Sequence, residues 1–215
     1  MDSAGERPDF WGYLGWSGLF CLLSGGSVLL AACVPPAGWR FLGGLVNSDD
    51  VSVYLAAMVQ GARGDWLYRA PFDPTPVPPT LVHSLYLLLG RLSAALGTDH
   101  VLIYHGARLV FGLSALLVAR WWTAALFRKR ETRMTAWLLV AFSSGLGWLL
   151  ALIPSAAWQA RLIDLRLPET STFLAALSSP HFALGTALEG LAMLAFWRAT
   201  EADRRLSLIH ISEPT

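Results

Sequence analysis

The feature that most constrains this chain is a series of apolar blocks long enough to cross a lipid bilayer as helices, which takes about 20 residues each. Only 14% of the residues are charged, whereas soluble domains carry about a quarter. The pattern predicts an all-α membrane protein embedded in the lipid bilayer, and the net charge of +1 gives no sign of nucleic-acid binding. The blocks lie at residues 10–34, 79–97, 101–127, 134–153 and 181–200.

Basic residues predict the side of the membrane, because cytoplasmic loops carry an excess of Lys and Arg. One basic cluster follows the third block at residues 128–133, and another follows the last block at 198–205. Two blocks separate these clusters, so both clusters can be cytoplasmic after an even number of crossings. This agreement predicts that block 101–127 runs from the outside to the inside.

Whether block 79–97 crosses the membrane decides on which side the N-terminus and residues 35–78 lie. If this block crosses, the N-terminus is external and residues 35–78 are cytoplasmic. If it lies at the interface, the N-terminus is cytoplasmic and residues 35–100 form one large outer loop. The leading prolines, the short length, the polar His83 and Arg91, and leucines at helical spacing favour an interfacial amphipathic helix.

The favoured organisation therefore has about four spans, and the first outer loop holds two interfacial helices. The spans are residues 10–34, 101–127, 134–153 and 181–200. The outer loops are residues 35–100, with helices near 49–62 and 79–97, and residues 154–180. The first block lacks the cleavage site of a signal peptide and is expected to be retained.

Three consecutive stretches carry a family resemblance: "DDVSVYLAAMVQGARGDWLY" (49–68), "PPTLVHSLYLLLGRLSAALG" (78–97) and "VLIYHGARLVFG" (101–112). In order and spacing they resemble the GT-C superfamily of membrane glycosyltransferases, in the group of protein O-mannosyltransferases and bacterial aminoarabinose transferase. Members of this group have an acidic pair opening the first outer loop, a helix that starts with prolines, and an Arg in the next span. This chain departs from the pattern at "PPT", where the family more often has Leu after the prolines.

The resemblance implies an N-terminal GT-C-like module in residues 1–205, from a bacterial plasma-membrane enzyme. Such an enzyme takes a sugar from a polyprenyl-phosphate donor at the outer face and transfers it to an acceptor. Because GT-C enzymes have more spans, we expect this portion to be inactive alone. We also expect residues 206–215, "LSLIHISEPT", to be a non-native tail.

Asp49 and Asp50 stand side by side where the first outer loop begins. Sugar transfer needs a carboxylate that takes the acceptor proton, and the resemblance assigns catalysis to this pair, with Asp49 as the base. Spacing alone does not decide between the two aspartates. A second interpretation is helix capping by Ser48 or Asp49, with Asp50 favourable at the positive end of helix 51–62.

Four further residues are candidates for substrate binding. Arg108 lies about two turns into its span, where an arginine is costly and faces a polar cavity or a partner. It would bind the donor phosphate, together with His105 one turn earlier; the alternatives are a structural ion pair or snorkelling to the interface. Glu169 and His181 lie on the predicted side of Asp49 and, with Asp50, are also candidate ligands of a possible divalent metal.

Two other functions stay open. A transporter or flippase component would explain the intramembrane charges Arg108 and Glu189 and the glycines of "SSGLGW" at 143–148. A non-catalytic membrane scaffold would explain loop acids that only cap helices. The enzyme hypothesis requires residues 35–78 to be outside, because donors of this class are used there.

Overall fold

The computed structural model describes residues 7–39, 41–75, 77–143 and 167–211, and in this part of the chain every regular element is a helix. The only β contact among these residues is an isolated bridge between Tyr68 and Thr80. The elements are α1 (Arg7–Cys33), α2 (Ser48–Ala62), α3 (Ser84–Leu96), α4 (His100–Leu126), α5 (Arg130–Phe142), the 3-10 turn η2 (Pro168–Thr170), α8 (Thr172–Ser178) and α9 (Pro180–Ile211).

Two helices are candidates for crossing a membrane by their length and apolar composition: Phe10–Cys33 within α1, and α4. They coincide with two of the predicted spans. The predicted span 134–153 begins in α5, and its second half lies outside the described residues, as does loop 154–180 up to residue 166. The predicted span 181–200 lies within α9, which does not meet the same criterion over its described residues.

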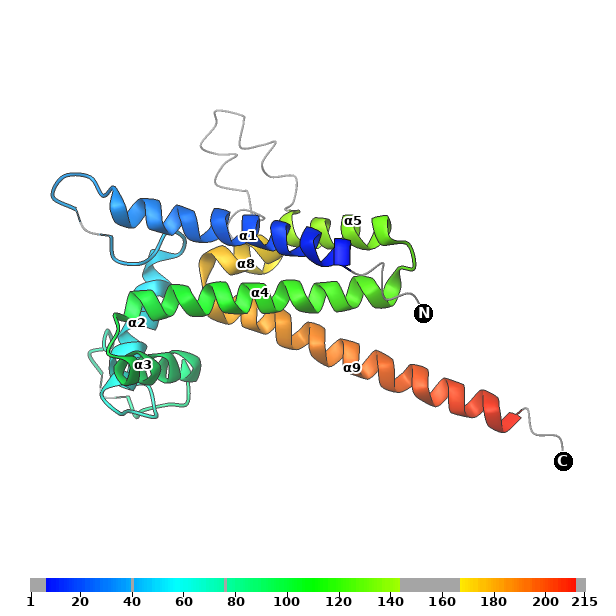
Figure 1. Cartoon of the computed structure of the whole chain (residues 1–215). Helices are drawn as coiled ribbons and strands as arrows, with labels where there is room; N and C mark the ends of the chain where they lie inside the picture. The colour runs from blue at the N-terminus through cyan, green and yellow to red at the C-terminus, as the bar shows by residue number, and fades with distance from the viewer. Residues whose placement is uncertain (1–6, 40, 76, 144–166, 212–215) are drawn as a thin grey trace, which may run out of the picture.

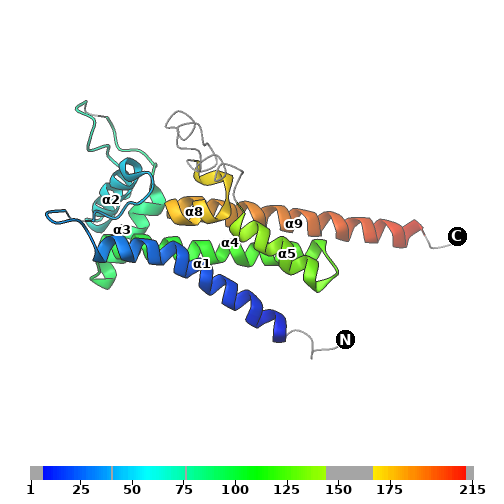
Figure 2. The same cartoon turned by 90° about the horizontal axis from the view of Figure 1, so that it is seen from above.

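The long helix α4 is the centre of the arrangement, because it packs against α1, α3, α5, α8 and α9. In Figures 1 and 2, α1 and α4 run alongside each other, and α2 and α3 gather at the end where α4 begins. The N-terminus of α1 and the turn between α4 and α5 lie at the opposite end. The loop helices and the basic turn are therefore separated by the length of α4.

Helix α3 has 13 residues, a length of about 20 Å, against a hydrocarbon core of about 30 Å. This length favours the interfacial alternative over a crossing. One face of α3 is buried against α2 and α4. The opposite face exposes Leu88, Leu92 and Leu96, one turn apart, which is the pattern of a helix that rests on a lipid surface.

Two glycines allow α2 and α3 to pack with their backbones in contact. A Cβ atom at Gly61 would lie 2.0 Å from the carbonyl oxygen of Leu87, and one at Gly90 would lie 1.9 Å from that of Met58. Any side chain at either position would force the helices apart. The close pairing of α2 with α3 therefore depends on these two residues.

Buried side chains form two main clusters. One joins α2 and α3 to the start of α4 through residues such as Tyr54, Met58 and Tyr86. The other joins α1, α4, α5, α8 and α9, and at its centre the Trp137 indole donates a 2.8 Å hydrogen bond to the Leu116 carbonyl. The first cluster positions the candidate site.

Candidate functional site

The acidic pair lies in the first turn of α2 rather than at its cap. The cap residue is Asn47, in a left-handed conformation with φ 50°, and its side chain makes no capping hydrogen bond. The prediction that Ser48 or Asp49 caps this helix is therefore wrong, because the helix begins at Ser48, one residue earlier than a Ser48 cap requires and two earlier than an Asp49 cap requires. Both carboxylates still lie at the positive end of the helix dipole, where negative charge is favourable.

The two aspartates face different surroundings, because successive residues of a helix point about 100° apart. Asp49 lines a pocket of about 470 Å³ together with Leu42, Gly44 and Ser52. Asp50 instead lies close enough to His83 and His181 to act on both electrostatically. The structure therefore separates the pair that the sequence left undecided.

Asp50 borders a group of packed rings, here called the tyrosine–histidine cluster. Its members come from α2, α3, α4, α9 and the loop before α3: Tyr54, Tyr68, His83, Tyr86, Tyr104 and His181. The Tyr54 and Tyr86 rings stack with centroids 4.3 Å apart and planes 7° from parallel. The His181 and Tyr54 rings pack edge to face, with their centroids 5.1 Å apart. Five segments far apart in the sequence thus meet at one place.

Hydrogen bonds hold the start of α9 against this cluster. The Tyr86 hydroxyl lies 2.6 Å from Nδ1 of His181, and the Tyr104 hydroxyl lies 2.9 Å from Oγ of Ser179. Burial raises the pKa of the Tyr86 hydroxyl far above its ordinary value. Tyr86 therefore stays protonated and can donate to His181, which fixes the direction of the imidazole ring.

His83 and Glu169 complete the surroundings of Asp50. Burial lowers the pKa of His83, and the nearby Asp50 carboxylate only partly opposes this effect. Burial also raises the pKa of Tyr54, and both Asp50 and Glu169 raise it further. His83 has a left-handed backbone with φ 55°, an uncommon conformation for a residue other than glycine that often occurs at functional sites.

Of the predicted site residues, Asp50, Glu169 and His181 therefore gather at one cluster, and Asp49 faces another pocket. The predicted metal site is not assembled from them. Within the described residues, no group of three or more His, Cys, Asp or Glu side chains is placed to hold a metal ion. What the cluster offers is a carboxylate at a helix N-terminus beside uncharged, hydrogen-bonded rings.

Arg108 and His105 make structural hydrogen bonds and do not belong to the tyrosine–histidine cluster. Arg108 is 0% exposed and donates to the carbonyl oxygens of Ala176 in α8, at 2.6 Å, and Ser24 in α1, at 2.9 Å. Its Nε donates to Nδ1 of His105, whose Nε2 lies 2.8 Å from the Gly43 carbonyl. Neither an ion pair nor snorkelling describes this arginine, since it joins three helices through backbone carbonyls.

Sequence reasoning missed His83, Tyr54 and Tyr86. Helical spacing could have identified Tyr54, because it lies four residues after Asp50 and therefore on the same face of the helix. No sequence signal brings Tyr86 or His83 to that face, because the approach depends on the packing of α3 against α2. Glu189, the intramembrane charge that the transporter hypothesis would explain, is exposed on α9.

Comparison of this chain with protein-family models, with curated proteins and with solved structures gives no match.

Proposed function

We propose that this chain forms the outer-face site of a membrane glycosyltransferase that moves a sugar from a polyprenyl-phosphate donor to an acceptor. The observation that carries the proposal is that Asp50 and Glu169 lie close enough to His181 and Tyr54 to act on both electrostatically, at one end of the candidate membrane helices. A lipid-linked donor keeps its tail in the bilayer and presents its sugar at such an end.

Asp50 is the base in this proposal, and it replaces Asp49 in that role. The acceptor hydroxyl gives its proton to the Asp50 carboxylate as its oxygen bonds to the anomeric carbon of the sugar. The bond between that carbon and the phosphate oxygen breaks, and the polyprenyl phosphate leaves with the electron pair. Attack on the side opposite the leaving phosphate gives inversion. The Asp50 carboxylate lies in the first turn of α2, where the helix dipole is positive.

His181 and Glu169 position the acceptor in this scheme. With Tyr86 on its Nδ1, the imidazole of His181 has Nε2 left to bond a sugar or acceptor hydroxyl. Glu169, in η2, adds a second carboxylate that can accept a hydrogen bond from a sugar or acceptor hydroxyl. Arg108 is not assigned to the donor phosphate, because its guanidinium is buried and bonded to carbonyls.

The membrane arrangement belongs to the same proposal: a multi-pass protein of a bacterial plasma membrane, with four spans, a cytoplasmic N-terminus and the cluster outside. Support comes from large apolar side chains exposed around the loop helices, where a membrane interface would cover them. They include Trp39, Leu42, Trp66, Phe72 and Leu81.

The test compares two neighbouring carboxylates in membranes that contain the full-length enzyme, because residues 1–205 alone are expected to be inactive. Labelled polyprenyl-phosphate hexoses and pentoses are supplied, and transfer of label to acceptors is measured. Asp50→Asn should lower the rate by about 100-fold or more, the usual effect of removing a general base. Asp49→Asn is the matched control, since it removes the same charge from the adjacent residue, and it should change the rate by less than about threefold.

Full activity of Asp50→Asn at normal expression would end the proposal that this carboxylate is the base. Equal losses in both variants would point to the charge at the start of α2, rather than to proton transfer, as the feature that matters.

A further inference from the structure

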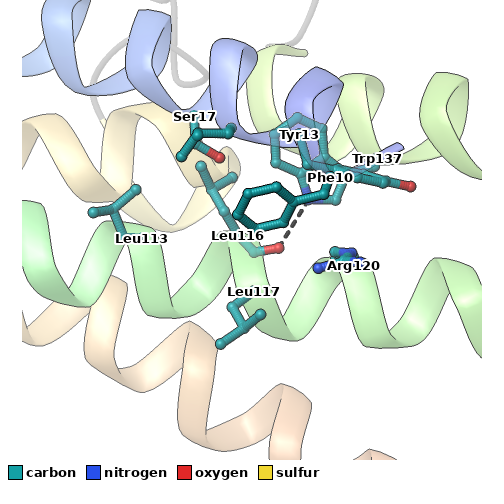
Figure 3. Close-up of a pocket in the computed structure, with 9 residues that line it drawn as sticks. Phe10, Tyr13, Ser17, Leu113, Leu116, Leu117, Arg120 and Trp137 are labelled. Carbon is teal, nitrogen blue, oxygen red and sulfur yellow. Dashed lines mark hydrogen bonds between the residues drawn. The ribbon is translucent and has the colours of Figure 1, made fainter. Parts of the chain in front are cut away.

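A second pocket lies away from Asp50, along the second half of α4. It is lined by α1, α4 and α5 and has a volume of about 140 Å³. Figure 3 shows Phe10, Tyr13 and Ser17 of α1 facing Leu113 and Leu116 of α4, with Leu117 below the α4 ribbon and Trp137 close to Tyr13. Among the described side chains of the lining, Arg120 of α4 is the one that carries a charge. The pocket thus combines an apolar wall with a single cation.

Arg120 has an aromatic partner but no acidic one. Its guanidinium carbon lies 4.9 Å from the centre of the Tyr13 ring, within the range of a cation–π contact. Across the ranges that the structure describes, no carboxylate forms an ion pair with Arg120. A half-buried arginine in a membrane helix needs an anion or water, and the aromatic face satisfies only part of that need.

The position of Arg120 fits the boundary between hydrocarbon and headgroups. It lies six residues before the end of α4 at Leu126, or about 9 Å along the axis. Trp121 follows it directly and is 40% exposed, and Trp11 at the same end is 67% exposed. Exposed tryptophans are typical of the membrane interface.

Size and charge together select the ligand. The volume of about 140 Å³ holds roughly five water-sized groups of about 30 Å³ each, enough for one phosphate group and the first carbons beside it. Leu14, Leu113 and Leu117 border the pocket and are 40–49% exposed. They offer an apolar path for a chain that continues out of the pocket. Free phosphate would leave this apolar wall uncovered.

We infer that this pocket binds the headgroup phosphate of an anionic phospholipid, with Arg120 as its ligand and an acyl chain along α1 and α4. The exposed basic turn at residues 127–129 lies at the same end and raises the local concentration of anionic lipid. This site is separate from the proposed sugar-transfer site and does not depend on it.

Native mass spectrometry of the purified chain in detergent tests the inference, with dioleoyl phosphatidylglycerol and dioleoyl phosphatidylcholine as probes. Wild type should bind the first phosphatidylglycerol about tenfold more tightly than phosphatidylcholine, the effect of one charge-assisted contact. Arg120→Gln should abolish this preference, and Arg120→Lys should retain much of it. Arg63→Gln changes an exposed arginine directly after α2; it is the matched control and should change affinity by less than about twofold.

A second variant keeps the test decisive if Arg120→Gln does not fold. Ser17→Phe fills the pocket and keeps Arg120, so it should also remove the preference for phosphatidylglycerol. Three results would overturn the inference: equal affinity of wild type for both lipids, an unchanged preference in folded Arg120→Gln, or displacement of the lipid by millimolar inorganic phosphate.

Discussion

Arg108 bonds to a carbonyl that the local sequence leaves without its usual partner. In a continuing helix, the Ala176 carbonyl would accept from the N–H four residues later, but that residue is Pro180, which has none. The Arg108 guanidinium takes its place at 2.6 Å and reaches the Ser24 carbonyl with its other terminal nitrogen. A proline at the start of α9 and an arginine in α4 therefore act as one structural unit.

Arg108→Met should destabilise the protein by about 1–3 kcal/mol, the cost of leaving the buried Ala176 carbonyl without a donor. Thermal unfolding of the purified protein in detergent measures this effect. Arg63→Met removes an exposed arginine and should change stability by less than about 0.5 kcal/mol. If the two variants unfold at the same temperature, Arg108 does not tie the helices together.

At the scale of elements, the loop helices are positioned by contact between backbones. Gly61 and Gly90 let α2 and α3 approach until each glycine meets a carbonyl of the other helix. This approach carries Tyr86 and His83 to the helix face that bears Asp50 and Tyr54. The candidate site therefore depends on two residues that have no chemistry of their own.

Gly90→Ala should force α3 away from α2, because the added Cβ would lie 1.9 Å from the Met58 carbonyl oxygen. We expect a loss of about 1–3 kcal/mol, as for other overpacked interiors, and faster hydrogen exchange in α3. Gly106→Ala is the matched control, since nothing lies within 4 Å of its added Cβ, and helix propensity favours alanine there by up to about 1 kcal/mol. Unchanged exchange in α3 of Gly90→Ala would contradict the close approach.

At the scale of the whole molecule, α4 sets the distance between two chemically different ends. One end holds Asp50 and the tyrosine–histidine cluster, and the other holds the Arg120 pocket and the basic turn. With α4 as a span, the two ends lie on opposite sides of the membrane. The proposed sugar transfer and the proposed lipid site would then act from different leaflets.

Cysteine labelling tests this sidedness. In a background with Cys21 and Cys33 replaced by Ser, Asp65→Cys should react with a membrane-impermeant maleimide on intact cells. Lys129→Cys should react only after permeabilisation, which also serves as the control for both sites. Both positions are exposed in the structure. Labelling of position 65 only after permeabilisation would place the loop helices in the cytoplasm and end the glycosyltransferase proposal.

Part of the candidate site can be predicted from local patterns in the sequence. The aspartates of α2 and the tyrosine one turn later can be read from helical spacing, and the two candidate membrane helices from the length of their apolar blocks. The partners of Arg108 could not be predicted. They are backbone carbonyls of α1 and α8, and a carbonyl has no signature in the sequence.

The sequence by itself determined that this chain is helical and apolar, where two of its long helices run, and that carboxylates open the first loop helix, because periodicity and length are local properties. Tertiary structure alone decided that Asp50, and not Asp49, lies near enough to His83 and His181 to act on them electrostatically. That choice depends on the rotation of α2 against α3 and α9, and helix packing through Gly61 and Gly90 sets this rotation.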